Sequence, residues 1–154
     1  MPASNQATSL QPPVFIKWFR ELSIGDIPLV GGKNASLGEM FRELAPRGVR
    51  VSDGFAVTSE AYRHFLRSAG LDAEITRLLV GLDTRDVDNL RQRGNRVRHA
   101  ILAAPFPAEL EAAILTAYAA LQGDAPEPVD VAVRSSATAE DLPDASFAGQ
   151  QETY

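Results

Sequence analysis

The sequence predicts an α/β fold that is rich in helix through its centre and carries small sheets. Apolar residues recur at helical spacing in several stretches between residues 34 and 121, so one face of each stretch can be buried. Short apolar or alternating runs at residues 14–19, 48–57 and 129–134 predict extended segments. Glycine and proline separate these stretches, as expected at the ends of helices and strands.

In the first third of the chain, residues 1–13 are polar and contain proline, so we expect a flexible leader. Residues 14–19 predict a short strand. Residues 24–30 lead into a glycine pair, and a helix follows over residues 34–44 because Leu37, Met40, Phe41 and Leu44 share one face. Residues 48–57 predict an extended segment, interrupted by a turn at residues 53–54.

Helices dominate the rest of the prediction. Thr58 or Ser59 caps a second helix that ends at Gly70. Residues 75–82 mark a short third helix. Residues 87–104 form a fourth despite Gly94, which costs roughly 1 kcal/mol relative to alanine. A fifth helix opens at Pro107 and closes at Gly123. A turn at residues 124–128 and a buried strand over residues 129–134 complete this part.

Composition limits the class of protein. A chain of 154 residues with 45% hydrophobic residues can bury a core, and one domain is the default. The net charge of −5 argues against a nucleic-acid partner. With no cysteine, the chain has no disulfide or thiolate metal site, which agrees with a cytoplasmic location. No apolar run of about eighteen residues occurs, so no membrane span is expected.

The first candidate site is the entrance of the helix at residues 34–44. Gly31 and Gly32 let the backbone approach an anion, the helix offers unpaired N–H groups, and Lys33 adds a positive charge. The pattern is not a P-loop, because Ile27 and Asn34 stand where that motif needs glycine and Ser or Thr. A phosphate site is one interpretation, and a plain turn with a solvated lysine is the other.

Arg134 is the second candidate, at the end of the predicted strand. A guanidinium can hold two phosphate oxygens at once. Its alternative role is a structural ion pair with an acidic residue that follows, namely Glu140, Asp141 or Asp144.

The third candidate is the loop at residues 147–153, whose small and polar residues could close over a nucleotide. The candidate binding residues of this loop are Gly149, Gln150, Gln151, Glu152 and Thr153. The alternative interpretation is an ordinary surface loop.

Other polar residues carry weaker signals. His64 and His99 lie off the apolar faces of their helices, so we expect solvated surface histidines without a metal role. The acidic residues at 140, 141 and 144 could bind magnesium in principle, but a solvated turn or pairing with Arg134 is preferred. Sequence motifs of hydrolases and of dinucleotide-binding proteins are absent.

Three separated segments together resemble the phosphoenolpyruvate synthase family. They are residues 31–40 (GGKNASLGEM), residues 54–58 (GFAVT) and residues 133–153, which run from VRSSATAED to FAGQQET. They occur in the family's order with similar spacing, and the resemblance covers about residues 18–154. Pyruvate phosphate dikinases share the lysine and arginine motifs but differ in the glycine-rich loop, and rifampicin phosphotransferase-like enzymes are nearer neighbours.

The resemblance implies that residues 14–154 are the N-terminal portion of an ATP-grasp domain. It also implies a reaction of gluconeogenesis in which ATP, pyruvate and water give AMP, phosphoenolpyruvate and phosphate through a phosphohistidine. Lys33 and Arg134 would hold the ATP phosphates as catalytic residues, and residues 149–153 would cover them. The family's magnesium ligands, phosphohistidine and pyruvate site would lie outside this chain, and neither histidine here matches the family's motif.

The sequence stops directly after the glycine-rich loop, so we expect a domain that is cut short. On this interpretation the rest of a full-length enzyme is its partner, the chain alone is inactive, and homo-oligomer formation stays open. The alternatives are a short non-catalytic protein that binds a nucleotide or partner, or a fragment of a related dikinase or rifampicin phosphotransferase.

Overall fold

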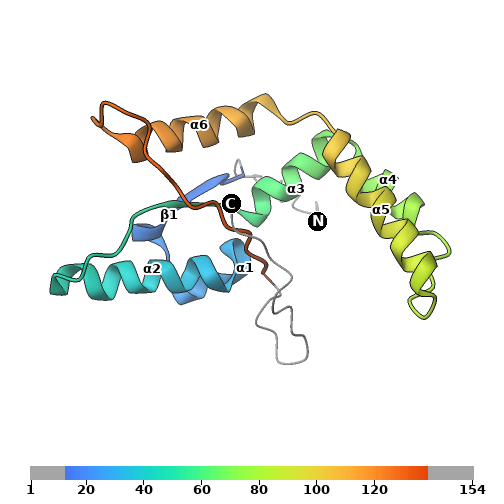
Figure 1. Cartoon of the computed structure of the whole chain (residues 1–154), viewed down its shortest axis with the longest axis horizontal. Helices are drawn as coiled ribbons and strands as arrows, with labels where there is room; N and C mark the ends of the chain where they lie inside the picture. Colours follow the sequence, from blue (N-terminus) through green and yellow to red (C-terminus); the bar gives the residue numbers. More distant parts are fainter. Residues whose placement is uncertain (1–12, 139–154) are drawn as a thin grey trace, which may run out of the picture.

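The computed structural model describes residues 13–138, and it shows a helix-rich α/β arrangement around a small sheet (Figure 1). Strand β1 (Ile16–Trp18) pairs antiparallel with β2 (Phe55–Val57), with Ile16 opposite Val57 and Trp18 opposite Phe55. The strand predicted at residues 14–19 is confirmed. The extended segment predicted at residues 48–57 forms a strand only over its last three residues.

The chain between the two strands is mainly helical. The helix predicted at residues 34–44 is confirmed as α2, which begins two residues earlier because Gly31 occupies its N-cap and accepts a hydrogen bond from Ala35 N at 3.1 Å. The elements in order are η1 (Phe19–Glu21), η2 (Ile24–Asp26), α1 (Ile27–Val30), α2 (Gly32–Leu44) and η3 (Ala45–Arg47), where η denotes a 3₁₀ helix.

A glycine sets the distance between α2 and η1. A Cβ atom on Gly38 would lie 2.4 Å from Leu22 Cβ and 2.9 Å from the Phe19 carbonyl oxygen. Only a glycine fits there, so the backbones approach closely over the fully buried Leu22. The buried residues of this first core are Leu22, Val30, Ala35 and Ala56.

Four longer helices follow β2, and the predictions for them are confirmed within a few residues. Thr58 caps the first: its hydroxyl accepts from Ala61 N at 3.1 Å and donates to the Val14 carbonyl at 2.5 Å. The third predicted helix begins earlier than expected because Gly70, at φ 67°, starts it directly at Leu71. The helices are α3 (Ser59–Ser68), α4 (Leu71–Leu79), α5 (Val87–Ala103) and α6 (Ala108–Gln122).

A second core joins these helices. Its buried residues are Ala61, Phe65, Leu71 and Leu110. Figure 1 shows β1 between α6 above and α2 below, while α4 and α5 pack together and project to the right as an arm. The second core lies at the root of this arm, so the arm is held where α3, α4 and α6 meet.

The buried strand predicted at residues 129–134 is wrong. Residues 129–133 have no regular secondary structure, Arg134 forms an isolated bridge, and Val131 and Val133 are 45% and 60% exposed. An alternating run becomes a strand only where a neighbouring strand offers hydrogen bonds and a surface to cover. Among the described residues β1 and β2 pair with each other, and this run has no place in their sheet.

Among residues 13–138, no single helix is both long and apolar enough to cross a membrane. Taken together, α5 and α6 meet the length and composition criteria, but a bend of 75° separates them.

Candidate functional site

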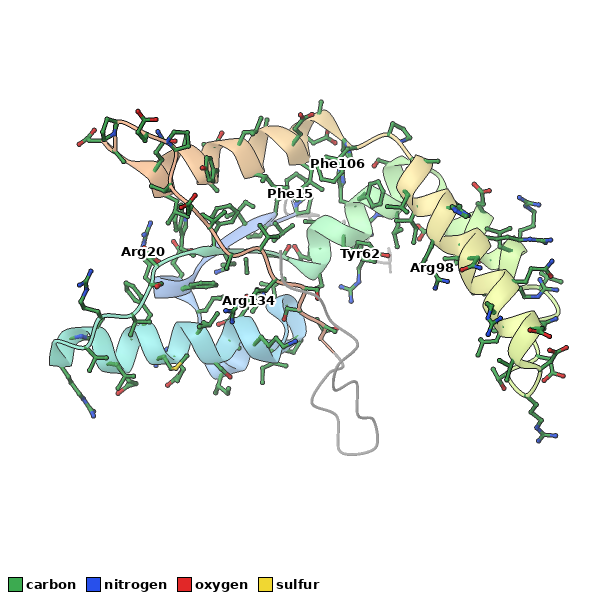
Figure 2. The ribbon with its side chains drawn as sticks, viewed as in Figure 1. Phe15, Arg20, Tyr62, Arg98, Phe106 and Arg134 are labelled. Atoms are coloured by element: carbon green, nitrogen blue, oxygen red, sulfur yellow. The ribbon has the colours of Figure 1, made fainter. Side chains whose placement is uncertain are left out.

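Two of the sequence-predicted sites meet at the start of α2. The Ser136 hydroxyl donates a hydrogen bond to the Val30 carbonyl at 3.0 Å, across 106 residues of sequence. In Figure 2, Arg134 lies on the segment that runs from α6 toward α1 and α2. The glycine pair with Lys33 and the segment that carries Arg134 therefore belong to one region of the fold.

The segment that follows Arg134 contacts the start of α2 at Gly31. The Gly31 φ of 79° and ψ of 160° suit glycine almost exclusively. A Cβ atom there would lie 2.2 Å from Ser136 Oγ and 2.8 Å from the Ala137 carbonyl oxygen. The segment after Arg134 therefore packs directly on the Gly31 backbone, and a side chain at this position would push it away.

The N-terminus of α2 is suited to an anion. The helix has 13 residues, and its N-cap, Gly31, supplies no side-chain acceptor. The first N–H groups of a helix have no acceptor within it and carry the positive end of the helix dipole. Lys33 lies in this first turn and is exposed. Because the dipole and the Lys33 charge act at the same end, they favour a phosphate over a neutral group.

Arg134 differs in one respect from its prediction. Its side chain is exposed and does not stand at the end of a buried strand. It is two residues from the Ser136 hydrogen bond, so its backbone is anchored beside α1. Exposure leaves the guanidinium accessible to a ligand in solvent, and its planar fork suits phosphate oxygens.

Other predicted site residues lie outside the described range. They are the acidic residues Glu140, Asp141 and Asp144 and the glycine-rich loop Gly149, Gln150, Gln151, Glu152 and Thr153. Neither the pairing of Arg134 with an acidic residue nor the covering role of the loop is tested by the structure, so both stay predictions.

The two histidines behave differently. His99 is exposed, as predicted. His64 is only partly solvated: its side chain is 24% exposed, its Nε2 lies 2.7 Å from Glu109 Oε1 and its ring centroid lies 5.0 Å from that of Phe15. The Glu109 backbone N–H and then the His64 side chain lower the pKa of the Glu109 carboxyl. This contact links α3 to α6. Because His64 and Glu109 are 45 residues apart in the sequence, no local pattern indicated their pairing.

Sequence reasoning also missed Ser136 and Asn34 as structural partners. Both side chains donate to the Val30 carbonyl, Asn34 Nδ2 at 2.8 Å and Ser136 Oγ at 3.0 Å. Small polar residues beside the two cations were the only available signal, because the shared acceptor is a backbone atom that any residue would supply.

Within residues 13–138, no group of three or more His, Asp or Glu side chains is placed to hold a metal ion. The described residues fit the phosphate portion of a nucleotide, because a close backbone, a helix N-terminus and two cationic side chains occur in one region.

Comparisons with known proteins agree with this chemistry. Residues 27–154 match the family described as pyruvate phosphate dikinase, AMP/ATP-binding domain. The chain is 54% identical over 144 residues to phosphoenolpyruvate synthase from Synechocystis sp., covering 90% of this chain and 18% of that protein.

Two further phosphoenolpyruvate synthases are similar to the same extent. The enzyme from Helicobacter pylori is 53% identical over 141 residues, covering 91% of this chain and 17% of the relative. The enzyme from Escherichia coli is 50% identical over 139 residues, covering 90% of this chain and 17% of that relative. The chain thus spans about a sixth of the length of these relatives. Because the family match extends over most of its residues, the chain belongs to the pyruvate phosphate dikinase AMP/ATP-binding domain family.

Proposed function

We propose that this chain is the nucleotide-binding part of a phosphoenolpyruvate synthase. In that reaction ATP, pyruvate and water give AMP, phosphoenolpyruvate and phosphate, through a phosphorylated histidine that this chain does not supply. Residues 14–154 would form the N-terminal portion of an ATP-grasp domain after a leader of 13 residues, and the rest of a longer cytoplasmic enzyme would provide the pyruvate and magnesium sites.

One observation carries the proposal. The glycine pair before Lys33 and the segment after Arg134 are far apart in the sequence, yet Ser136 Oγ lies 3.0 Å from the Val30 carbonyl oxygen. Two motifs that each suit a phosphate therefore share one region at a helix N-terminus. A solvated lysine in a plain turn would not require a second cationic segment beside it.

The chemistry assigns different tasks to the two cations. Lys33 is a compact charge beside the backbone N–H groups of α2, whereas Arg134 can hold two phosphate oxygens with one rigid group. Phosphoryl transfer depends mainly on positioning and on stabilising the charge of the transferred group. Both side chains would thus act directly on the ATP phosphates, and the loop at residues 149–153 would cover them and exclude water.

The covering role of the loop has its own test. Limited proteolysis of the full-length protein should cut within residues 147–153, and saturating ATP with magnesium should slow that cleavage. Equal cleavage with and without nucleotide would contradict the covering role without affecting the assignment of Lys33 and Arg134.

Substitution of the two cations tests the main proposal. In the full-length protein we expect Arg134→Ala and Lys33→Ala each to lower the rate of pyruvate-dependent AMP formation about 10²- to 10³-fold, the loss typical of one preorganised donor. The control is Arg47→Ala, which removes a 72% exposed arginine beyond the opposite end of α2. Near-normal turnover in Arg134→Ala would overturn the role of that residue, and AMP formation that does not depend on pyruvate would overturn the acceptor.

A further inference from the structure

We infer that Ser136 is a positioning residue that fixes the two cationic side chains of the phosphate site relative to each other. The inference rests on the proposed function of Lys33 and Arg134. Ser136 acts through a single backbone acceptor, the Val30 carbonyl, which also holds Asn34. We call these three groups the Val30 clamp.

The clamp joins two distant parts of the chain at one atom. The Val30 carbonyl oxygen accepts from Asn34 Nδ2 at 2.8 Å and from Ser136 Oγ at 3.0 Å. Val30 is 4% exposed and ends α1, where a carbonyl has lost its intrahelical donor. Two side-chain donors therefore satisfy a buried acceptor that would otherwise be costly to leave unpaired.

The position of the clamp gives it a role beyond packing. Asn34 directly follows Lys33, and Ser136 is two residues after Arg134. One oxygen thus anchors the backbone beside each cation, and the bare Gly31 backbone lets the two segments come close enough to share it. The clamp therefore sets the separation of the two backbone segments that carry the cations before a nucleotide arrives.

A preorganised pair of cations binds phosphate more tightly than a pair whose spacing fluctuates, because less ordering is needed on binding. Loss of the Ser136 hydroxyl frees the Arg134 segment on one side, while Asn34 still satisfies the carbonyl. We therefore expect Ser136→Ala to weaken binding of Mg-ATP about fivefold, the size of one ordinary hydrogen bond.

Ser59→Ala is the matched control. The Ser59 hydroxyl also donates to a carbonyl of α1, that of Pro28, at 3.2 Å, but it comes from α3 and is not adjacent to either cation. If Ser136 mattered only because it holds α1 in place, both serine variants would change Mg-ATP binding alike.

The deciding experiment is a double-mutant cycle in the full-length protein, with Mg-ATP titrated by calorimetry. Ser136→Ala should weaken binding about fivefold in the natural background and less than twofold when Arg134→Ala is already present. Ser59→Ala should leave binding within twofold. Asn34→Ala is a second variant should Ser136→Ala not fold, and its effect should shrink in the same way in the Lys33→Ala background.

The outcomes separate the two levels of the proposal. If Arg134→Ala and Lys33→Ala leave Mg-ATP binding unchanged, the proposed function fails and the inference fails with it. If those variants weaken binding but Ser136→Ala does not, or weakens it equally in both backgrounds, the proposed function stands and the positioning role of Ser136 is overturned.

Discussion

The two parts of this chain are packed by opposite means. We call residues 13–57 with residues 134–138 the glycine-packed part, and residues 59–123 the helical part. In the first, backbones touch at Gly31 and Gly38, where no Cβ would fit. In the second, large side chains such as Phe65 and Leu110 fill the space between helices.

The difference shows where precision is needed. A backbone-to-backbone contact has no rotatable side chain between its partners, so it fixes positions closely, and the cationic candidates lie beside such a contact. The helical part leaves Leu102 82% exposed and Val87 66% exposed, and its α4 and α5 project away from the candidate site. We therefore expect the glycine-packed part to tolerate far less change in side-chain volume.

Gly31→Ala should give the largest loss of stability. A Cβ atom 2.2 Å from Ser136 Oγ and 2.8 Å from a backbone oxygen must displace the 134–138 segment, in a backbone conformation that disfavours alanine. We expect a loss of about 4 kcal/mol in the free energy of unfolding. Urea unfolding of the chain, followed by fluorescence of its one tryptophan, Trp18, measures it.

Gly48→Ala provides the control for that substitution. Gly48 has a similar φ of 81°, but its ψ of 8° lies in the left-handed region, and no heavy atom lies within 4 Å of the added Cβ. Its cost should be limited to about 1 kcal/mol of backbone strain. Equal losses in the two variants would show that a positive φ alone accounts for the glycine, and that neither the ψ of Gly31 nor its close contact with Ser136 adds to the loss.

Leu110→Ala should be the most damaging truncation in the helical part. Leu110 is 2% exposed in the second core, so its removal leaves a cavity between helices and should cost about 3 kcal/mol. Leu115→Ala, on the same helix but 59% exposed, should change stability by less than about 0.5 kcal/mol. Thermal unfolding of both variants, followed by circular dichroism, tests whether burial in this part determines the loss.

Substitution of one helical glycine in each part should change stability in opposite directions. Gly38→Ala in α2 should destabilise the chain by about 2 kcal/mol, because its Cβ would meet Leu22 Cβ at 2.4 Å. Gly94→Ala in α5 should stabilise it by about 1 kcal/mol, because the nearest atom is the flexible Arg98 Nη1 at 3.5 Å and alanine favours the helix. Changes of the same sign in urea unfolding would remove the distinction between the two parts.

The smallest expected effect is a pH dependence in the glycine-packed part. The backbone N–H of Ser23 and then its hydroxyl donate to Asp26 Oδ2 at 2.8 and 2.9 Å, and they lower the pKa of Asp26 below 3.8. A lowered folded-state pKa means that this stability is complete well above pH 3.8, the ordinary value, and is lost as pH falls through the folded-state value.

Asp26→Asn tests this dependence. The wild-type advantage should be less than about 1 kcal/mol at neutral pH, since the group is near the surface, and should shrink in acid. Urea midpoints of both proteins from pH 7 to pH 3 measure it. An advantage that grows as the pH falls would contradict the sign of the pKa shift.

Local sequence rules predicted most of the helices. Thr58 caps α3 as expected from its hydroxyl, and Pro107 and Gly123 flank α6 as predicted, because capping depends on residues within one turn. The prediction of a strand at residues 129–134 was wrong because a strand depends on more than its own residues. An alternating apolar run describes one strand, while a sheet requires a neighbour that the local pattern does not specify.

The candidate site divides in the same way. Lys33 and Arg134 could be chosen from the sequence, because a cation beside small residues is a local pattern typical of phosphate binding. The pairing of His64 with Glu109 and the shared Val30 carbonyl could not be predicted from the sequence. Each joins residues that are 45 or more positions apart, and no local motif marks either contact.

By itself, then, the sequence determined the longer helices and their caps, the glycine positions and the identity of the two candidate cations. These features depend on interactions between residues that are a few positions apart, so a local sequence pattern is enough to predict them. Only the tertiary structure decided that the Arg134 segment packs on Gly31, that it does so without a buried strand, and that one carbonyl anchors both cationic segments. Those outcomes depend on which distant backbones can approach within hydrogen-bonding distance, and that is set by packing of the whole fold.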